Sequence, residues 1–211
     1  MSWQIGSNQA TVKNMRNFSE KNSRYEIRIA GSGGQGIILA GIMLAEAAIL
    51  DGRYVIQSQS YGPEARGGRS VSEIILSEVE IDYPRALELD LLVALTQEAC
   101  DRNLLDLKED GLVIVDTEMV HGVIWGKVVS LPFRQIAQGV GETRAINMAA
   151  LGAIVAFCPS VSRDSLARVM SRRLPSAKVE ANLLAFDKAL ELARNSKGKL
   201  KFVDTQDEFE I

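Results

Sequence analysis

The chain has 211 residues, 46% hydrophobic and 24% charged, which is enough to bury a core without disulfide bonds. Its 24 basic and 27 acidic residues give a formal net charge of −3, so nothing in the total charge suggests a nucleic-acid-binding protein. Neither Cys100 nor Cys158 belongs to a C-x-x-C pair, which argues against a zinc or iron–sulfur site carried by this chain alone. No apolar run reaches the length of a membrane span, and reduced thiols fit a cytoplasmic protein.

The two ends of the chain differ in composition from its middle. Residues 1–24 are polar and weakly basic, without the apolar stretch of a signal peptide, and they predict a disordered tail. Residues 195–211 predict an acidic C-terminal tail. The segment between them, 25–194, is therefore expected to form a single domain.

Strands and helices alternate along this domain. Strands are predicted at 25–30, 54–59, 71–78, 90–95, 112–116 and 127–133, and helices at 36–52, 97–108, 142–157, 162–173 and 176–194. Thr96 and Ser162 are the expected N-caps of two of these helices, and Asp110-Gly111 is an expected turn. Continuous apolar runs such as "DLLVAL" are typical of parallel strands covered on both faces. The pattern predicts a Rossmann-like α/β fold, with a mainly parallel sheet flanked by helices.

A glycine-rich turn joins the first strand to the first helix. In "GSGGQG", residues 31–36, Gly31, Gly33 and Gly36 satisfy G-x-G-x-x-G, and backbone amides beside a helix N-terminus suit a phosphate. A dinucleotide site also needs an acidic residue at the end of the second strand, where this chain has Gln57 and Gln59. Two interpretations therefore stand side by side: a nicotinamide or flavin site, and a turn whose glycines only permit close helix–sheet packing.

A second segment rich in glycine, "SYGPEARGGRS", spans residues 60–70. Its Arg-Gly-Gly-Arg turn offers guanidinium groups and unhindered backbone amides, which suit a phosphate, a carboxylate or the acidic edge of a partner. Taken alone, the segment is equally compatible with a solvated surface loop.

The two motifs together resemble a known family. The succession of "AGSGGQGIILAG", "SYGPEARGGRSVSEIILS", "DLLVALTQEA" and "INMAALGAIVA" is similar to the gamma subunit of 2-oxoacid:ferredoxin oxidoreductases, over about residues 25 to 194. The resemblance implies a complex that oxidatively decarboxylates a 2-oxoacid to an acyl-CoA and passes electrons to ferredoxin. It also implies thiamine diphosphate, Mg²⁺ and iron–sulfur clusters, with CoA as co-substrate.

This chain has neither a G-D-G motif for thiamine diphosphate nor a cysteine cluster. The resemblance therefore implies that alpha and beta subunits carry the thiamine and that a ferredoxin-like subunit carries clusters. Among the oxoacids it favours 2-oxoglutarate, with pyruvate and branched-chain oxoacids next. Three other interpretations remain: an independent NAD(P)- or flavin-dependent oxidoreductase, the small subunit of an indolepyruvate:ferredoxin oxidoreductase, and an assembly or regulatory protein.

Candidate contact residues come from the two glycine-rich segments. The candidates for contact with CoA or a partner are Gly31, Gly33, Gly34, Gln35, Gly36, Tyr61, Glu64, Arg66, Gly67, Gly68 and Arg69. No catalytic residue and no metal ligand is assigned to this chain. Its one histidine, His121, follows a predicted strand and is expected to be a loop or packing residue.

Overall fold

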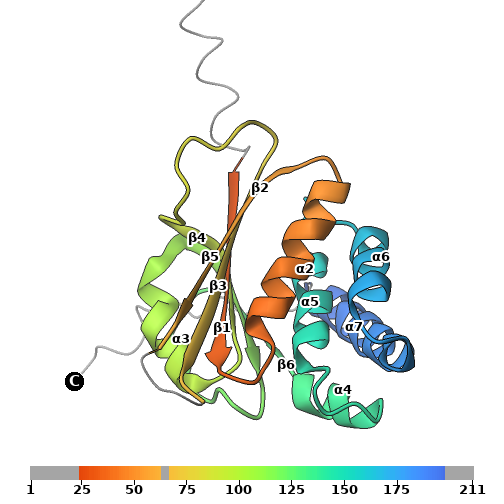
Figure 1. The fold of residues 1–211 in the computed structure, drawn as a ribbon. Helices are drawn as coiled ribbons and strands as arrows, with labels where there is room; N and C mark the ends of the chain where they lie inside the picture. The colour runs from red at the N-terminus through yellow and green to blue at the C-terminus, as the bar shows by residue number, and fades with distance from the viewer. Residues whose placement is uncertain (1–23, 63–66, 198–211) are drawn as a thin grey trace, which may run out of the picture.

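A computed structural model describes residues 24–62 and 67–197, which form a six-stranded sheet with helices on both faces (Figure 1). The strands are β1 (Arg24–Ser32), β2 (Tyr54–Tyr61), β3 (Arg69–Ser77), β4 (Leu89–Ala94), β5 (Leu107–Asp116) and β6 (Val128–Leu131). The helices are α2 (Ile37–Leu50), α3 (Gln97–Asn103), η1 (Leu104–Asp106), α4 (Phe133–Gly139), α5 (Ile146–Phe157), α6 (Arg163–Arg173) and α7 (Ser176–Ser196).

The strand order is β2-β3-β1-β4-β5-β6. The pairs β1–β4, β4–β5 and β5–β6 are parallel, whereas β3 runs antiparallel to both β1 and β2. The predicted α/β fold with a mainly parallel sheet is confirmed. The order nevertheless departs from that of a dinucleotide-binding fold, in which the second parallel strand lies beside the first. Here β3 takes that place, and β2 and β3 form a hairpin.

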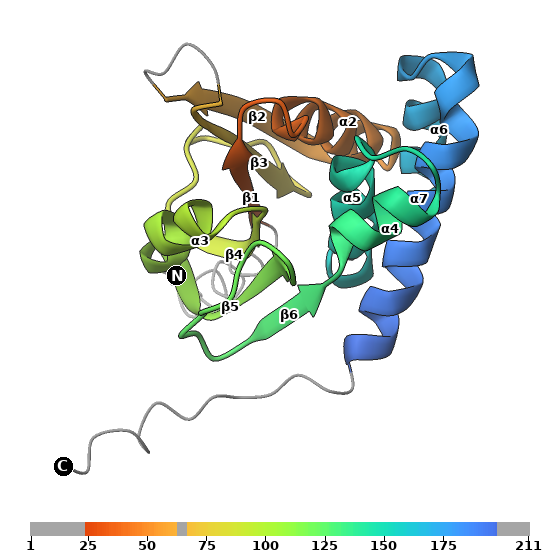
Figure 2. The same ribbon diagram turned by 90° about the horizontal axis from the view of Figure 1, so that it is seen from below.

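The larger core lies on one face of the sheet. Figure 2 shows α2, α4, α5, α6 and α7 on this side and α3 on the other. The nearly all-apolar helix α2 is covered both by the sheet and by helices, with Met43 and Leu44 fully buried. Helices α5 and α7 approach closely at Gly152, where a Cβ would come within 2.1 Å of the Phe186 carbonyl oxygen. A side chain at Gly152 would therefore force these two helices apart.

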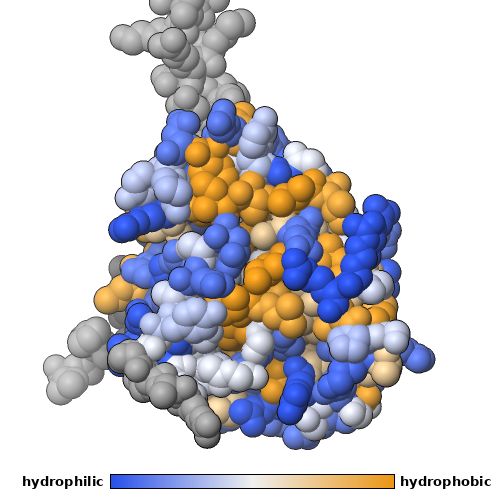
Figure 3. All heavy atoms as spheres, viewed as in Figure 1, coloured by the Kyte–Doolittle hydropathy of each residue, from blue (hydrophilic) through white to orange (hydrophobic). Residues whose placement is uncertain are grey.

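A smaller core lies beneath α3, where Cys100 packs with apolar residues of β4 and β5. Some apolar side chains remain outside both cores. Ile49 and Leu50 at the end of α2 and Tyr54 at the start of β2 are exposed. Figure 3 shows hydrophobic residues on one face of the molecule, from its upper part down through its middle, with hydrophilic residues around them. In the described part of the chain, no helix is both long and apolar enough to cross a membrane.

The structure differs from the predicted elements in two regions of the chain. The helix predicted at 97–108 ends at Asn103, and the expected turn Asp110-Gly111 lies inside β5. This strand starts early because Leu107 pairs with Leu89 before a register shift, and only a glycine fits at 111, where a Cβ would lie 2.9 Å from the Leu89 carbonyl oxygen.

The second difference concerns the residues after β5. The strand predicted at 127–133 is shorter, and the short helix α4, which the sequence analysis missed, begins at Phe133 directly after Pro132. The helix predicted from 142 begins instead at Ile146.

Both predicted N-caps are confirmed. Thr96 Oγ1 accepts a hydrogen bond from the Ala99 amide at 3.2 Å, and Ser162 Oγ accepts one from the Ser165 amide at 3.1 Å. At the domain limits, β1 begins at Arg24 and α7 ends at Ser196, slightly beyond the predicted bounds. The rest of the two predicted tails lies outside the described residues, apart from Lys197.

Candidate functional site

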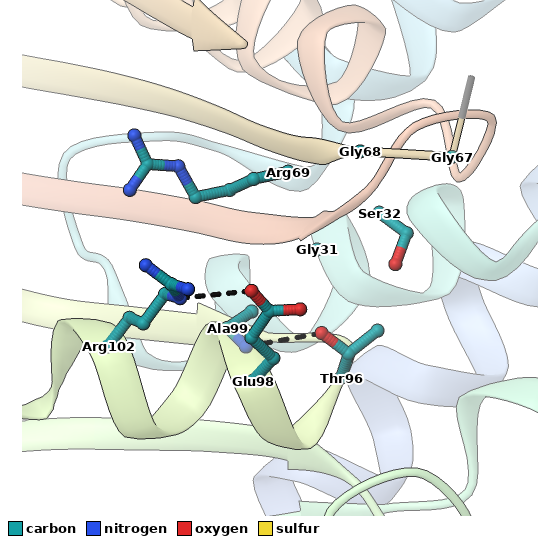
Figure 4. Close-up of a pocket in the computed structure, with 9 residues that line it drawn as sticks. All are labelled: Gly31, Ser32, Gly67, Gly68, Arg69, Thr96, Glu98, Ala99 and Arg102. Carbon is teal, nitrogen blue, oxygen red and sulfur yellow. Dashed lines mark hydrogen bonds and ion pairs between the residues drawn. The ribbon is translucent and has the colours of Figure 1, made fainter. Parts of the chain in front are cut away.

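Three segments meet at the carboxyl ends of β1 and β4: the glycine-rich turn after β1, the end of the β2–β3 hairpin loop and the start of α3 (Figure 4). They enclose a shallow pocket of about 150 Å³. Its lining residues are Gly31, Ser32, Gly67, Gly68, Arg69, Thr96, Glu98, Ala99 and Arg102. Because β2 runs in the same direction as β1, the hairpin loop reaches the edge of the sheet where α/β proteins commonly bind ligands.

The hairpin loop is fastened to the glycine-rich turn through the backbone. The Gly33 amide donates to the Gly68 carbonyl oxygen at 2.7 Å, and the Gly62 amide donates to the Arg69 carbonyl oxygen at 2.7 Å. A Cβ on Gly33 would lie 3.4 Å from that same Gly68 oxygen, which shows how closely the two backbones approach. The Gly33 amide is thus engaged within the chain and does not point at a ligand.

Gln35 also makes internal contacts. Its Oε1 accepts from the Ser32 amide at 2.7 Å, and its Nε2 donates to the Leu95 carbonyl oxygen at 3.4 Å. A side chain at Gly31 would collide with this amide group, since a Cβ there would come within 2.3 Å of Oε1. Gln35 therefore ties the turn to the end of β4, and the glycine at position 31 makes room for it.

The remaining glycines of the turn face a different hollow. Gly34 and Gly36 have φ of 91° and 72°, in the left-handed region that favours glycine. The Gly36 carbonyl oxygen accepts from Nδ2 of buried Asn147 at 3.1 Å. Gly34, Gln35 and Gly36 line a second pocket of about 200 Å³, together with Arg144 and other residues. Of the sequence-predicted glycines, the first pocket is thus lined by Gly31, Gly67 and Gly68 and the second by Gly34 and Gly36, whereas Gly33 lines neither.

The first pocket carries three charged side chains, Arg69 from β3 and Glu98 and Arg102 from α3. Arg102 Nε pairs with Glu98 Oε1 at 2.9 Å, one helical turn apart, and both side chains are more than half exposed. Arg69 has no ion pair with any residue that the structure describes. In Figure 4 the guanidinium groups of Arg69 and Arg102 lie on the same side of the pocket. The site is consequently positive overall and open to an anion.

Glu98 and Arg102 were missed by the sequence analysis. Their position could have been inferred from the sequence, because they lie one helical turn apart on a capped helix that directly follows a central strand. Of the predicted candidates, Tyr61 is 62% exposed at the end of β2 and does not line the pocket. Glu64 and Arg66 lie outside the described residues. His121 is an exposed loop residue whose amide donates to Gln97 Oε1 at 2.9 Å.

The cysteines are poorly suited to nucleophilic chemistry. Burial raises the pKa of both the Cys100 and the Cys158 thiols to about 11, so the reactive thiolate is disfavoured at neutral pH. Within residues 24–62 and 67–197, no group of three or more His, Cys, Asp or Glu side chains could hold a metal ion.

Comparison with known proteins gives consistent matches over nearly all of the described domain. A model of the family "Pyruvate ferredoxin/flavodoxin oxidoreductase" matches residues 26–192. The 2-oxoglutarate synthase subunit KorC of Methanocaldococcus jannaschii is 42% identical over 177 residues, which cover 81% of this chain and 95% of that relative.

Two solved structures share the fold. The gamma subunit of a keto/oxoacid ferredoxin oxidoreductase from Geobacter sulfurreducens has a TM-score of 0.74 and 44% identity, covering 81% of this chain and 96% of the other. The 2-oxoglutarate:ferredoxin oxidoreductase of Magnetococcus marinus, solved with 2-oxoglutarate, coenzyme A and succinyl-CoA bound, has a TM-score of 0.74 and 27% identity. That match covers 83% of this chain and 32% of the longer Magnetococcus chain.

Proposed function

The chain belongs to the pyruvate ferredoxin/flavodoxin oxidoreductase family, and on this premise we propose that its charged pocket helps to bind CoA. The protein is a gamma subunit of a multi-subunit 2-oxoacid:ferredoxin oxidoreductase. The observation that carries the CoA proposal is the convergence of Arg69 and Arg102, from different elements, at a pocket that is also lined by the backbone of Gly31, Gly67 and Gly68.

The chemistry of CoA matches this pocket. Its diphosphate and ribose phosphate are anions, and the planar guanidinium fork of arginine binds phosphate through two hydrogen bonds. The walls at Gly31, Gly67 and Gly68 carry no side chains that would keep a bulky ligand away from the backbone. The presence of coenzyme A in the related Magnetococcus enzyme also supports the proposal.

Electron-transfer chemistry is assigned to other chains of the complex. The described residues do not fit thiamine diphosphate or an iron–sulfur cluster. They include no group of side chains that could hold a metal ion, and the two cysteines are buried in different cores. We therefore place the thiamine with its Mg²⁺ on alpha and beta subunits and the clusters on a ferredoxin-like subunit, with ferredoxin as electron acceptor. The role proposed for this chain is to bind and orient CoA, in a cytoplasmic complex.

The favoured oxoacid is 2-oxoglutarate, because the KorC relative is 42% identical and carries that substrate in its name. The complex, purified with its partner chains, is assayed with 2-oxoglutarate, pyruvate and a branched-chain oxoacid. The highest kcat/KM is expected for 2-oxoglutarate, and a higher value for either competitor would reject this choice.

The alternative of an independent nucleotide-dependent oxidoreductase conflicts with two features. The Gly33 amide is occupied by Gly68, and β3 lies where a dinucleotide fold has its second parallel strand. Under our proposal the chain purified alone is colourless and inactive. A yellow or brown chain, carrying its own flavin or cluster, would contradict the proposal.

The CoA proposal is tested by replacing Arg69 and Arg102 with Ala in the assembled complex. Losing a charged contact to an anion can cost about 2–5 kcal/mol, so we expect KM for CoA to rise by roughly tenfold or more while KM for the oxoacid stays unchanged. Arg163→Ala, which removes an exposed arginine paired with Asp187 away from the pocket, is the matched control. If KM for CoA is unaltered in the double variant, this pocket does not bind CoA.

A further inference from the structure

A charged network beneath the pocket connects its two walls, and we propose that Arg28 at the centre of this network is a positioning residue. One wall is the β2–β3 hairpin, which carries Gly68 and Arg69, and the other is α3, which carries Glu98 and Arg102. Arg28 fixes the separation of these walls, and with it the separation of the two pocket arginines. The consequence for CoA rests on the function proposed above.

The first branch of the network reaches the hairpin. Arg28 lies on β1 directly opposite Glu73 of β3 in the antiparallel register. Its Nε and Nη2 donate to Glu73 Oε1 at 3.0 and 2.5 Å. The second carboxylate oxygen of Glu73 accepts from Ser58 Oγ of β2 at 3.2 Å. Both strands of the hairpin are therefore tied to the same guanidinium group.

The second branch reaches the helical wall. Arg28 Nη1 donates to Asn103 Oδ1 at 3.0 Å and also pairs with Asp106 of η1. Asn103, the last residue of α3, donates from Nδ2 to the Ala99 carbonyl oxygen at 2.6 Å. Ala99 lines the pocket. Because Arg28 and Asn103 are almost fully buried, water cannot readily replace these contacts.

The placement of the network explains why it acts on the pocket. Arg69 and Glu73 project from the same face of β3, since side chains of a strand alternate between faces. Arg102 immediately precedes Asn103. If the distance between Glu73 and Asn103 changes, the distance between Arg69 and Arg102 changes with it, because each pair of neighbours shares one strand or one helix. Buried ion pairs contribute little net stability compared with apolar packing, and a role in fixing geometry accounts better for a charged group at this place.

The kinetic test uses variants that cut one branch each. Glu73→Gln weakens the hairpin branch, and Asn103→Ala weakens the helical branch, which keeps only its pair with Asp106, while Arg28 stays in place. Each variant in the complex is expected to raise KM for CoA by roughly threefold to thirtyfold and to leave kcat nearly unchanged. Because the branches act in series, the double variant should raise KM little more than the larger single effect. Arg173→Ala, which removes an exposed ion pair with Glu46, is the control.

A distance measurement separates this inference from the CoA proposal. Spin labels at the exposed sites Ser60→Cys and Asp101→Cys report the separation of hairpin and α3, and the buried native thiols stay unlabelled. We expect a narrow distance distribution in the otherwise wild-type full-length chain and a broadened or shifted one when Glu73→Gln and Asn103→Ala are added.

The outcomes are distinguishable. An unchanged distance distribution would overturn the role of Arg28. A changed distribution, with Arg69→Ala and Arg102→Ala leaving KM for CoA unaltered, would support the positioning role and reject the CoA pocket. If the arginine variants raise KM but the branch variants change neither KM nor the distance, the CoA pocket stands and Arg28 has no positioning role.

Discussion

Gly33 and Gly68 are joined backbone to backbone, with the amide of the first donating to the carbonyl oxygen of the second at 2.7 Å. This contact joins the two glycine-rich motifs, which lie far apart along the chain, into one structural unit. A Cβ on Gly33 would lie 3.4 Å from the Gly68 carbonyl oxygen, so a larger branched side chain there would interfere with this approach. The turn that resembles a nucleotide-binding loop here holds the hairpin loop in place. The positively charged groups of the pocket are instead side chains of β3 and α3, Arg69 and Arg102.

The first prediction concerns Gly36. Its φ of 72° lies in the left-handed region, and a Cβ there would lie 2.3 Å from Asn147 Nδ2. Gly36→Ala is therefore expected to lower the free energy of unfolding by about 1–3 kcal/mol, measured by chemical denaturation of the chain. Gly139→Ala is the control, because position 139 lies in a helix and has open space around it. An unchanged denaturation midpoint for Gly36→Ala would show that the turn adopts another backbone conformation without loss of stability.

The second prediction concerns Gly33, whose constraint differs from what the G-x-G-x-x-G motif suggests. Gly33 does not have a positive φ, so its constraint is space alone. A Cβ would meet Gly68 at ordinary contact distance, but the branched side chain of Val would reach further. Gly33→Ala should retain full CoA kinetics in the complex, whereas Gly33→Val should raise KM for CoA because it displaces the hairpin loop. An equal KM for CoA in the two variants would contradict the idea that the close approach of Gly33 to Gly68 limits the size of the side chain at position 33.

Local sequence signals predicted those elements that local forces determine. The apolar runs gave β4 and the last half of β5, and the hydroxyl caps Thr96 and Ser162 gave the starts of α3 and α6. The direction and neighbours of β3 could not be derived in this way, because its apolar pattern specifies a strand without specifying its partner. Arg102 was missed for the same reason, since only the tertiary fold brings it beside Arg69.

The third prediction concerns how the stability of the fold depends on pH. Burial alone would raise the pKa of Asp51, but hydrogen bonds from Ser165 Oγ at 2.6 Å and from the Ser162 amide at 2.6 Å outweigh it and hold the pKa below its ordinary value. These contacts fasten the end of α2 to the start of α6. A carboxylate with a lowered pKa stabilises the fold above its unfolded-state pKa, and this stabilisation is lost as pH falls through the folded-state pKa.

Asp51→Asn should therefore be less stable than wild type at pH 7, and the difference should shrink as the pH falls below about 4. Because Asp51 is only partly buried, the difference at pH 7 is expected to stay within about 1 kcal/mol. Thermal melts across this pH range measure it, with the exposed Asp164→Asn as control. A difference that is constant with pH would mean that the ionised form is not favoured.

The fourth prediction concerns Asp116 at the end of β5. Its buried carboxylate accepts from the Glu118 amide at 2.9 Å and from the Arg134 amide at 3.1 Å, which fixes the turn after β5 and the start of α4. Asp116→Ala leaves two amides without their acceptor, and a buried unsatisfied donor costs about 1–3 kcal/mol. Chemical denaturation should show a loss of at least this size, while Asp164→Ala should show none. A wild-type midpoint would mean that water replaces the carboxylate.

The last prediction concerns Glu98, the one acidic side chain among the residues that line the proposed CoA pocket. Its carboxylate pairs with Arg102 at 2.9 Å and would repel a phosphate that approaches the same guanidinium group. Glu98→Gln keeps the size of the side chain, removes the repulsion and releases Arg102 for the ligand. Exposed ion pairs are worth about 0.2–1 kcal/mol, so KM for CoA in the complex should fall by roughly one and a half to fivefold.

Salt gives this prediction a second, independent measurement. Interactions between exposed charges are largely screened beyond the Debye length, which is about 10 Å at 0.1 M salt and about 3 Å at 1 M. The advantage of Glu98→Gln should therefore shrink as salt is added. Glu180→Gln, on the exposed face of α7, makes the same change in net charge elsewhere and should leave KM for CoA unaltered. A rise in KM for Glu98→Gln would show that the carboxylate holds Arg102 in its binding orientation, and that Glu98 supports the CoA site rather than competing with the ligand.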